Sequence, residues 1–179
     1  CRLRDGQAWS LALVAQPQFQ SYDPGDSDAL TGMAKREWSV DGGLQLSGRL
    51  GRWELSLRGV SDLLGRHDGQ LASAGVSYSL GGPKLMVAPG AGVEWESAAY
   101  VDYYYGVRPS EARTGRPAYD SRDAVNPYAG LRARYGFNRN WGVFTYLRHT
   151  WLDDAITDSP IVARDTVYSG VVAVTYSFF

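Results

Sequence analysis

The chain has 179 residues and a net charge of −1, which is enough for one domain and gives no basic field that would favour a nucleic-acid partner. Mean hydropathy is −0.30, and no run of about 18 apolar residues occurs, so a transmembrane helix is excluded. The single cysteine excludes an internal disulfide.

Eight segments alternate apolar and polar side chains with the period of two that is typical of β-strands. Trp53 and Leu55, for example, alternate with Glu54 and Arg58. Charged side chains are excluded from lipid because an arginine at the bilayer midplane costs about 2–4 kcal/mol, so the charged phase is predicted to face a lumen. In chain order the segments are 9–20, 38–50, 53–63, 70–80, 85–95, 126–137, 141–151 and 166–178.

The connections between these segments alternate in length. The short ones are 51–52, 81–84 and 138–140, and the long ones are 21–37, 64–69, 96–125 and 152–165. Outer-membrane barrels have short periplasmic turns and long outer loops. The last segment is therefore predicted to run toward the periplasm.

Six tryptophans stand at the ends of the segments, on their apolar phase. An indole ring is favoured at the membrane–water interface, whereas a soluble β-protein would bury it near the middle of a strand. The sequence therefore predicts an all-β, antiparallel up-and-down transmembrane β-barrel that contacts outer-membrane lipids. The predicted periplasmic and outer rings are Trp9, Trp53 and Trp141, and Trp38, Trp95 and Trp151, respectively.

The two ends of the chain carry further signals. The aromatic C-terminus resembles the segment by which the barrel assembly machinery recognises its substrates, so Tyr176, Phe178 and Phe179 are the predicted assembly signal, with Phe179 as one extra residue. Residues 3–7 are predicted to form a turn that follows the end of a strand at 1–3; a lipidated Cys1 is the less favoured alternative. We therefore expect residues 1–179 to be one barrel domain that is the C-terminal part of a larger barrel. Its eight strands should then either leave an open seam between the first and last strands or close a barrel narrower than the native one.

Four loops, at 23–33, 65–69, 104–119 and 152–162, resemble the MltA-interacting protein family, also called the OmpV family. The most specific stretches are Tyr-Gly-Val…Ala-Tyr within 105–119 and Asp-Ser-Pro-Ile-Val at 158–162. The resemblance implies an outer-membrane barrel of more than eight strands. It also implies a non-enzymatic scaffold that links a lytic transglycosylase to a murein synthase, or, for some members, a porin-like or adhesive role. The family offers no catalytic motif, and we predict no cofactor.

The inward phase carries clustered charge. Counting back from the short turns places Arg49 opposite Glu54 and Arg132 opposite Tyr146. Two interpretations remain open: an anion-attracting constriction, or a lumen filled by pairs of arginines with Glu54, Glu94 or Asp41, which we favour because small barrels are filled by side chains. The predicted lumen residues are Glu54, Arg58, Arg132, Arg134, Tyr146 and Arg148.

Other polar residues have ordinary explanations. The carboxylates of 23–28 and 153–158 are candidate calcium ligands, but they lack the EF-hand spacing, so we predict solvated loops and no metal. The tyrosine run at 103–105 is either an adhesive patch or the lining of a loop that folds into the mouth. His67 has no nearby serine in the sequence, and His149 falls on the lipid phase, so neither predicts a hydrolase.

Pro17 and Pro89 lie inside predicted strands, although proline cannot donate a ladder hydrogen bond. We expect a local bulge at each, or an earlier strand end at Pro17.

Overall fold

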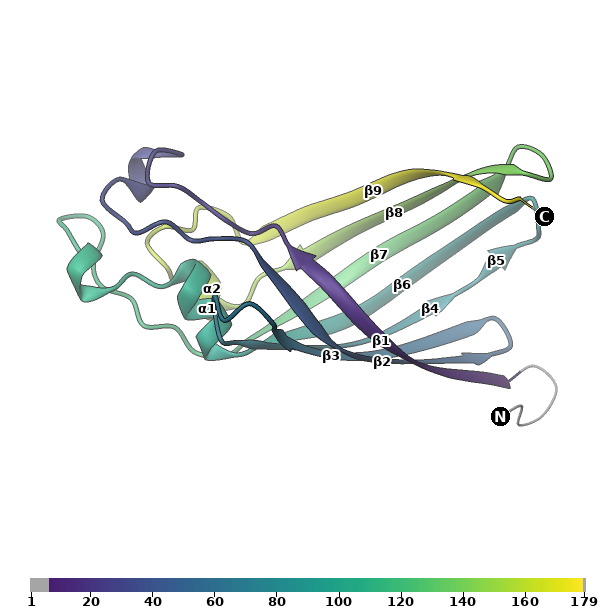
Figure 1. Cartoon of the computed structure of the whole chain (residues 1–179), viewed down its shortest axis with the longest axis horizontal. Helices are drawn as coiled ribbons and strands as arrows, with labels where there is room; N and C mark the ends of the chain where they lie inside the picture. Colours follow the sequence, from purple (N-terminus) through teal and green to yellow (C-terminus); the bar gives the residue numbers. More distant parts are fainter. Residues whose placement is uncertain (1–6, 179) are drawn as a thin grey trace.

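A computed structural model describes residues 7–178 and shows one strongly curled antiparallel sheet (Figure 1). Eight long strands pair in sequence order, and the two-residue strand β5 pairs with β6. This confirms the predicted all-β, up-and-down architecture. The strands are β1 (Gln7–Gln18), β2 (Ser39–Leu50), β3 (Trp53–Asp62), β4 (Gln70–Tyr78), β5 (Leu80–Gly81), β6 (Leu85–Glu96), β7 (Ala124–Gly136), β8 (Trp141–Trp151) and β9 (Thr166–Tyr176).

The curled sheet is open within the described part of the chain, because β1 and β9 are its two edges and do not pair with each other. An open seam between the first and last strands is one of the two outcomes that the sequence predicts. The expected turn at 3–7 lies largely outside the described residues, and the strand end at 1–3 and Phe179 lie wholly outside them.

The pairing register agrees with the register counted from the short turns. Arg49 lies opposite Glu54, and Arg132 lies opposite Tyr146. The apolar phase points out of the sheet: Leu13 is 88% exposed and Leu57 is 54% exposed. Such a continuous apolar outer surface is what a strand needs to face lipid chains.

The bulges expected at the two prolines are wrong. β1 keeps one register with β2 through Pro17 and ends at Gln18, two residues earlier than the predicted segment, so the alternative of an earlier strand end near Pro17 is the one that agrees with the structure. Pro89 pairs in unbroken register with β7, whereas on its other side the pairing stops at Ser77 and resumes in the same register at Leu80. Because proline has no N–H to donate, the ladder is interrupted without an extra residue, and this gap separates β4 from β5.

The two ends of the sheet differ in their connections (Figure 1). The short-turn end carries the connections 51–52, 82–84 and 137–140, and the long-loop end carries 19–38, 63–69, 97–123 and 152–165. The long loops contain the helices α1 (Ala98–Tyr105) and α2 (Asp154–Thr157) and the 3-10 turns η1 (Asp28–Leu30) and η2 (Pro109–Glu111). None of the helices within residues 7–178 is long and apolar enough to cross a membrane.

The long-loop end has its own hydrophobic core. Val101 and Tyr104 of α1 and Ile156 of α2 are buried, and they pack with Val60 and Leu71 from the ends of β3 and β4. The tyrosine run therefore faces inward, as in the second of its two interpretations, because Tyr104 is buried and its neighbours are half-buried. The loops thus form a folded cluster at this end of the sheet.

Candidate functional site: the inner wall and the long-loop end

Ion pairs connect strands that are not neighbours in the sheet. Arg132 of β7 donates from Nη1 to Oε1 of Glu54 on β3 at 3.1 Å and from Nη2 to Ser77 Oγ on β4 at 2.7 Å. Arg49 approaches the other carboxylate oxygen of Glu54 at 3.7 Å. Because β4 and β6 lie between β3 and β7, the Arg132–Glu54 pair crosses the concave side of the curled sheet.

A second network lies nearer the long-loop end and is centred on Glu94 of β6. Its Oε1 accepts from Arg148 Nη2 at 2.9 Å, and its Oε2 accepts from Arg58 Nη2 at 3.3 Å. Arg58 also donates from Nη1 to Gln16 Oε1, and the Arg148 guanidinium lies 4.0 Å from the ring centre of Tyr128. One carboxylate therefore holds two arginines from β3 and β8.

Four of the five arginines considered for a filled lumen form these ion pairs: Arg49, Arg58, Arg132 and Arg148. Arg134 differs, because it is exposed and forms no ion pair within residues 7–178. Tyr146 lines the space beside Arg132. The geometry places these side chains on one wall, and their role in solute binding stays a prediction.

Two cavities lie along this wall. The first has a volume of about 390 Å³ and contains Glu54, Arg132 and Tyr146. The second has a volume of about 710 Å³, lies toward the long-loop end and contains Glu94, Glu96 and Arg148. Tyr128 and Tyr146 line both cavities, which are therefore adjacent.

Small residues make room for Tyr128 on this wall. A Cβ atom on Gly75 or Gly92 would overlap the hydroxyl of Tyr128. The two glycines on β4 and β6 therefore let the phenol of Tyr128 reach from β7 across β6 to β4. The phenol separates the Glu54 network from the Glu94 network.

The predicted interface tryptophans lie at the two ends of the sheet. Trp53 and Trp141 are at the short-turn end, and their rings pack 4.8 Å from those of Tyr78 and Tyr176. Five of the six are at least 45% exposed, whereas Trp95 is half-buried and donates from Nε1 to Asp123 at 3.3 Å. Their contact with lipid headgroups stays a prediction. The six residues are Trp9, Trp38, Trp53, Trp95, Trp141 and Trp151.

The predicted assembly signal is partly described. Tyr176, the last residue of β9, and Phe178, two residues beyond it, are both exposed, with ring centres 4.9 Å apart. Phe179 lies outside the described residues. Recognition by the assembly machinery stays a prediction.

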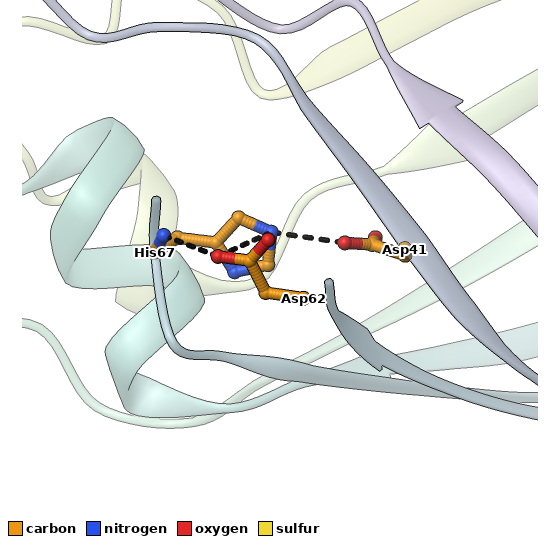
Figure 2. A group of neighbouring side chains, drawn as sticks. All are labelled: Asp41, Asp62 and His67. Atoms are coloured by element: carbon orange, nitrogen blue, oxygen red, sulfur yellow. Dashed lines mark hydrogen bonds and ion pairs between the residues drawn. The ribbon is translucent and has the colours of Figure 1, made fainter. Parts of the chain in front are cut away.

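A buried cluster of Asp41, Asp62 and His67 closes the loop between β3 and β4 (Figure 2). Asp62 accepts from Ser39 Oγ at 2.5 Å and from the backbone N–H groups of the loop, including that of His67 at 2.7 Å. His67 Nδ1 accepts from the Gly69 N–H at 3.0 Å, so Nε2 carries the proton that points at Asp41, 3.0 Å away. A cation would have to displace that proton, so the donor set fits a structural clamp better than a metal site.

The sequence interpretation missed this cluster because it treated His67 alone. Asp41 belongs to β2 and Asp62 to the end of β3, and only their pairing in the sheet brings the two carboxylates together. No spacing motif signals such a contact.

A second clamp, also missed from the sequence, joins two long loops. The guanidinium of Arg36 is 1% exposed and forms two parallel bonds to Glu111, at 3.2 and 3.1 Å. Arg36 Nε also donates to the backbone oxygen of Tyr103 at 2.6 Å. Burial acts to raise the pKa of Glu111, but the bonds from Arg36 and from the amides of Ala34 and Arg108 outweigh it and hold the pKa below its ordinary value.

Three of the acidic loop residues, Asp23, Asp26 and Asp153, have protein partners. Asp153 caps α2 by accepting from the Ala155 N–H at 2.9 Å, and Asp23 pairs with the exposed Lys35 at 3.1 Å. His149 packs against Trp151 and Tyr168 on the outer face, with ring centres 4.4 and 4.3 Å away. These contacts fix the positions of Asp23, Asp153 and His149.

Residues 1–178 match the family described as MltA-interacting protein MipA. The chain belongs to the MipA family of outer-membrane proteins. It is 42% identical to the MltA-interacting protein of Escherichia coli K12 over 104 residues, which is 56% of this chain and 40% of the relative. It is 31% identical to the outer membrane protein OmpV of Vibrio cholerae over 162 residues, 88% of this chain and 62% of the relative.

The similarity extends along most of the chain in a further relative. The putative outer membrane protein YiaT of Escherichia coli K12 is 28% identical over 172 residues, which is 94% of this chain and 70% of the relative. The chain thus spans between 40% and 70% of the length of these three relatives. No solved structure matches it.

Proposed function

We propose that this chain is part of a non-enzymatic outer-membrane scaffold for murein synthesis and remodelling, which binds a lytic transglycosylase and a murein synthase. The observation that carries the proposal is membership of the MipA family together with 42% identity to a relative named for its interaction with MltA. The ion pairs across the inner wall also support it, because they brace the strands that hold the connecting turns in place.

The short-turn end is the surface that we assign to the partners. Short turns lie on the periplasmic side of outer-membrane barrels, where murein also lies. Each of the three turns exposes one basic side chain, Arg52, Lys84 or Arg139. Exposed charges of one sign speed the encounter with an acidic partner surface and set its orientation.

The engagement of His67 supports the non-enzymatic part of the proposal. Its two ring nitrogens are occupied by the Gly69 amide and Asp41, so this histidine is not free to activate a hydroxyl group.

Binding of purified MltA to the full-length protein in detergent tests the proposal. Substituting Arg52, Lys84 and Arg139 together by glutamine should weaken binding about tenfold, which corresponds to ~1.4 kcal/mol. The matched control removes three exposed basic groups at the long-loop end, Arg66, Arg122 and Arg164, and should leave binding unchanged. Wild-type protein that does not retain MltA at all would contradict the proposal.

A porin-like channel is the second candidate, and the adjacent inner cavities favour it. If solutes pass along this wall, Arg132 and Arg148 would favour anions. Bilayer recordings should then show a steady conductance whose preference shifts toward cations in Arg132→Ser and Arg148→Ser. A filled scaffold predicts no steady conductance.

A further inference from the structure

A buried carboxylate at the long-loop end lacks a counter-charge. Glu96, the last residue of β6, is 7% exposed, and its Oε2 has no hydrogen-bond partner within residues 7–178. The side chain lines the cavity of about 710 Å³. A buried charge without a partner is costly, so the carboxyl stays largely protonated until a ligand brings a positive group that stabilises its ionised form.

The arginines of the same cavity are already engaged elsewhere. Arg58 and Arg148 both pair with Glu94, which points to the same side of β6 two residues earlier. Arg148 Nε donates to Thr150, and Arg58 Nη1 donates to Gln16. The cavity thus holds two carboxylates and two guanidiniums, but one carboxylate takes both cations.

The remaining lining is polar and partly aromatic. Tyr100 donates to Gln20 Oε1 at 3.0 Å, and Asn126 and Tyr105 lie on the same cavity wall as Glu96. Burial raises the pKa of Tyr105, so its phenol stays neutral and can donate or accept a hydrogen bond. Amide, hydroxyl and phenol groups of this kind suit the hydroxyl groups of a hydrophilic ligand.

We propose that this cavity binds a small hydrophilic primary amine whose ammonium group pairs with Glu96. An ammonium group offers three donors, enough to bond the free oxygen of Glu96 and neighbouring acceptors at once. The volume lies within the range of about 300–1,000 Å³ that is usual for small-molecule sites. The proposal does not depend on the scaffold function, since the cavity lies at the opposite end of the sheet from the short turns.

Two probes of almost the same shape test the charge requirement. Tris(hydroxymethyl)aminomethane carries an ammonium group near neutral pH, and pentaerythritol replaces that group by an uncharged hydroxymethyl. Saturation-transfer NMR on the full-length wild-type protein in detergent should show at least about tenfold tighter binding of the amine, the ratio that one charged hydrogen bond supplies. Equal binding of the two probes, or no binding of the amine, overturns the proposal without requiring any variant.

Variants then locate the site. Glu96→Gln should abolish the preference for the amine, whereas Asp120→Asn, which removes an exposed carboxylate outside the cavity, should keep it. The altered migration of folded barrels in unheated gels shows whether Glu96→Gln has folded. If it has not, Tyr105→Phe is the second variant and should weaken binding of the amine several-fold. Full amine preference in a folded Glu96→Gln protein places the ligand elsewhere and overturns the proposal.

Discussion

The two ends of the sheet are held by different kinds of interaction. At the short-turn end the connections are local: Gly51 and Gly81 adopt positive φ angles of 61° and 92° that glycine tolerates, and aromatic rings pack between neighbouring strands. At the long-loop end buried charges join distant segments, as in the pair of Arg36 with Glu111, which lie 75 residues apart. The short-turn end is therefore held together by residues that are close in the sequence. The long-loop end is held together by residues from distant parts of the chain.

The two kinds of interaction should respond differently to a single substitution. A local turn loses only its own contacts when one side chain is removed. A buried ion pair leaves an uncompensated charge when one partner is removed, so the penalty is large. We therefore expect the long-loop end to be the more sensitive to single changes, and the short-turn end the more tolerant.

The largest effect is expected for Arg36→Ala. Removing the guanidinium leaves Glu111 buried without its partner, which should cost about 3–5 kcal/mol of loop stability. Limited proteolysis should cleave the loops at 19–38 and 97–123 much faster, while the sheet stays folded. Lys35→Ala, which removes an exposed pair with Asp23, is the control and should change cleavage little. Equal sensitivity of the two variants would show that the buried pair does not hold the loops.

In the sheet between the two ends, a charged substitution on the outer phase should cost most stability near the middle of a strand. Leu57→Arg places a charge on the outer phase near the middle of β3 and should destabilise the folded protein by about 2–4 kcal/mol. Leu50→Arg, on the same phase but at the strand end, should cost at most about 1 kcal/mol. Urea unfolding in lipid vesicles measures both. Equal costs would contradict the assignment of this phase to the membrane.

Low pH should loosen the long-loop end selectively. The pKa of Glu111 lies below its ordinary value of 4.5, so the unfolded loop takes up a proton at higher pH than the folded loop does. The stabilisation is fully present above the ordinary pKa and is lost as the pH falls through the folded pKa. Proteolysis of the loops by an acid-active protease should accelerate in that window, and Glu111→Gln should remove this pH dependence. If cleavage of the loops in Glu111→Gln depends on pH as it does in the wild type, Glu111 is not the group that loosens the loops.

The smallest effect is expected for Arg49→Gln near the short-turn end. The Arg49 side chain is 68% exposed and lies 3.7 Å from Glu54, which already binds Arg132. Exposed pairs contribute about 0–1 kcal/mol, so urea unfolding should barely change. A loss larger than that of Arg36→Ala would reverse the comparison between the two ends.

The sheet could be predicted from the sequence because the alternation of apolar and polar residues along each strand shows which side chains lie on which face. Trp53, Leu55 and Leu57 alternate with polar residues, and the short turns then set the register that places Arg49 opposite Glu54. The Arg132–Glu54 contact follows only in part, because its partners sit on strands separated by two others. Alternation gives the face of a residue but not the curvature that brings opposite walls together.

The long-loop end could not be predicted in the same way. Arg36, Glu111 and Asp62 look like ordinary solvated loop or strand-end charges in the sequence, yet all three lie in hydrogen-bond networks with little exposure. Their partners are set by the folded path of the loops, which carries no periodic signal. The expected bulge at Pro89 is also wrong, because the ladder is interrupted there without an extra residue.

The orientation of the two ends is the central claim, since the scaffold proposal assigns the short turns to the periplasm. Labelling of intact cells with a membrane-impermeant maleimide tests it directly, with Cys1 replaced by serine and a single cysteine introduced as Arg139→Cys or Arg164→Cys. We predict that position 164, in the loop between β8 and β9, is labelled in intact cells, and that position 139 is labelled only after the outer membrane is permeabilised. The opposite pattern would contradict the account.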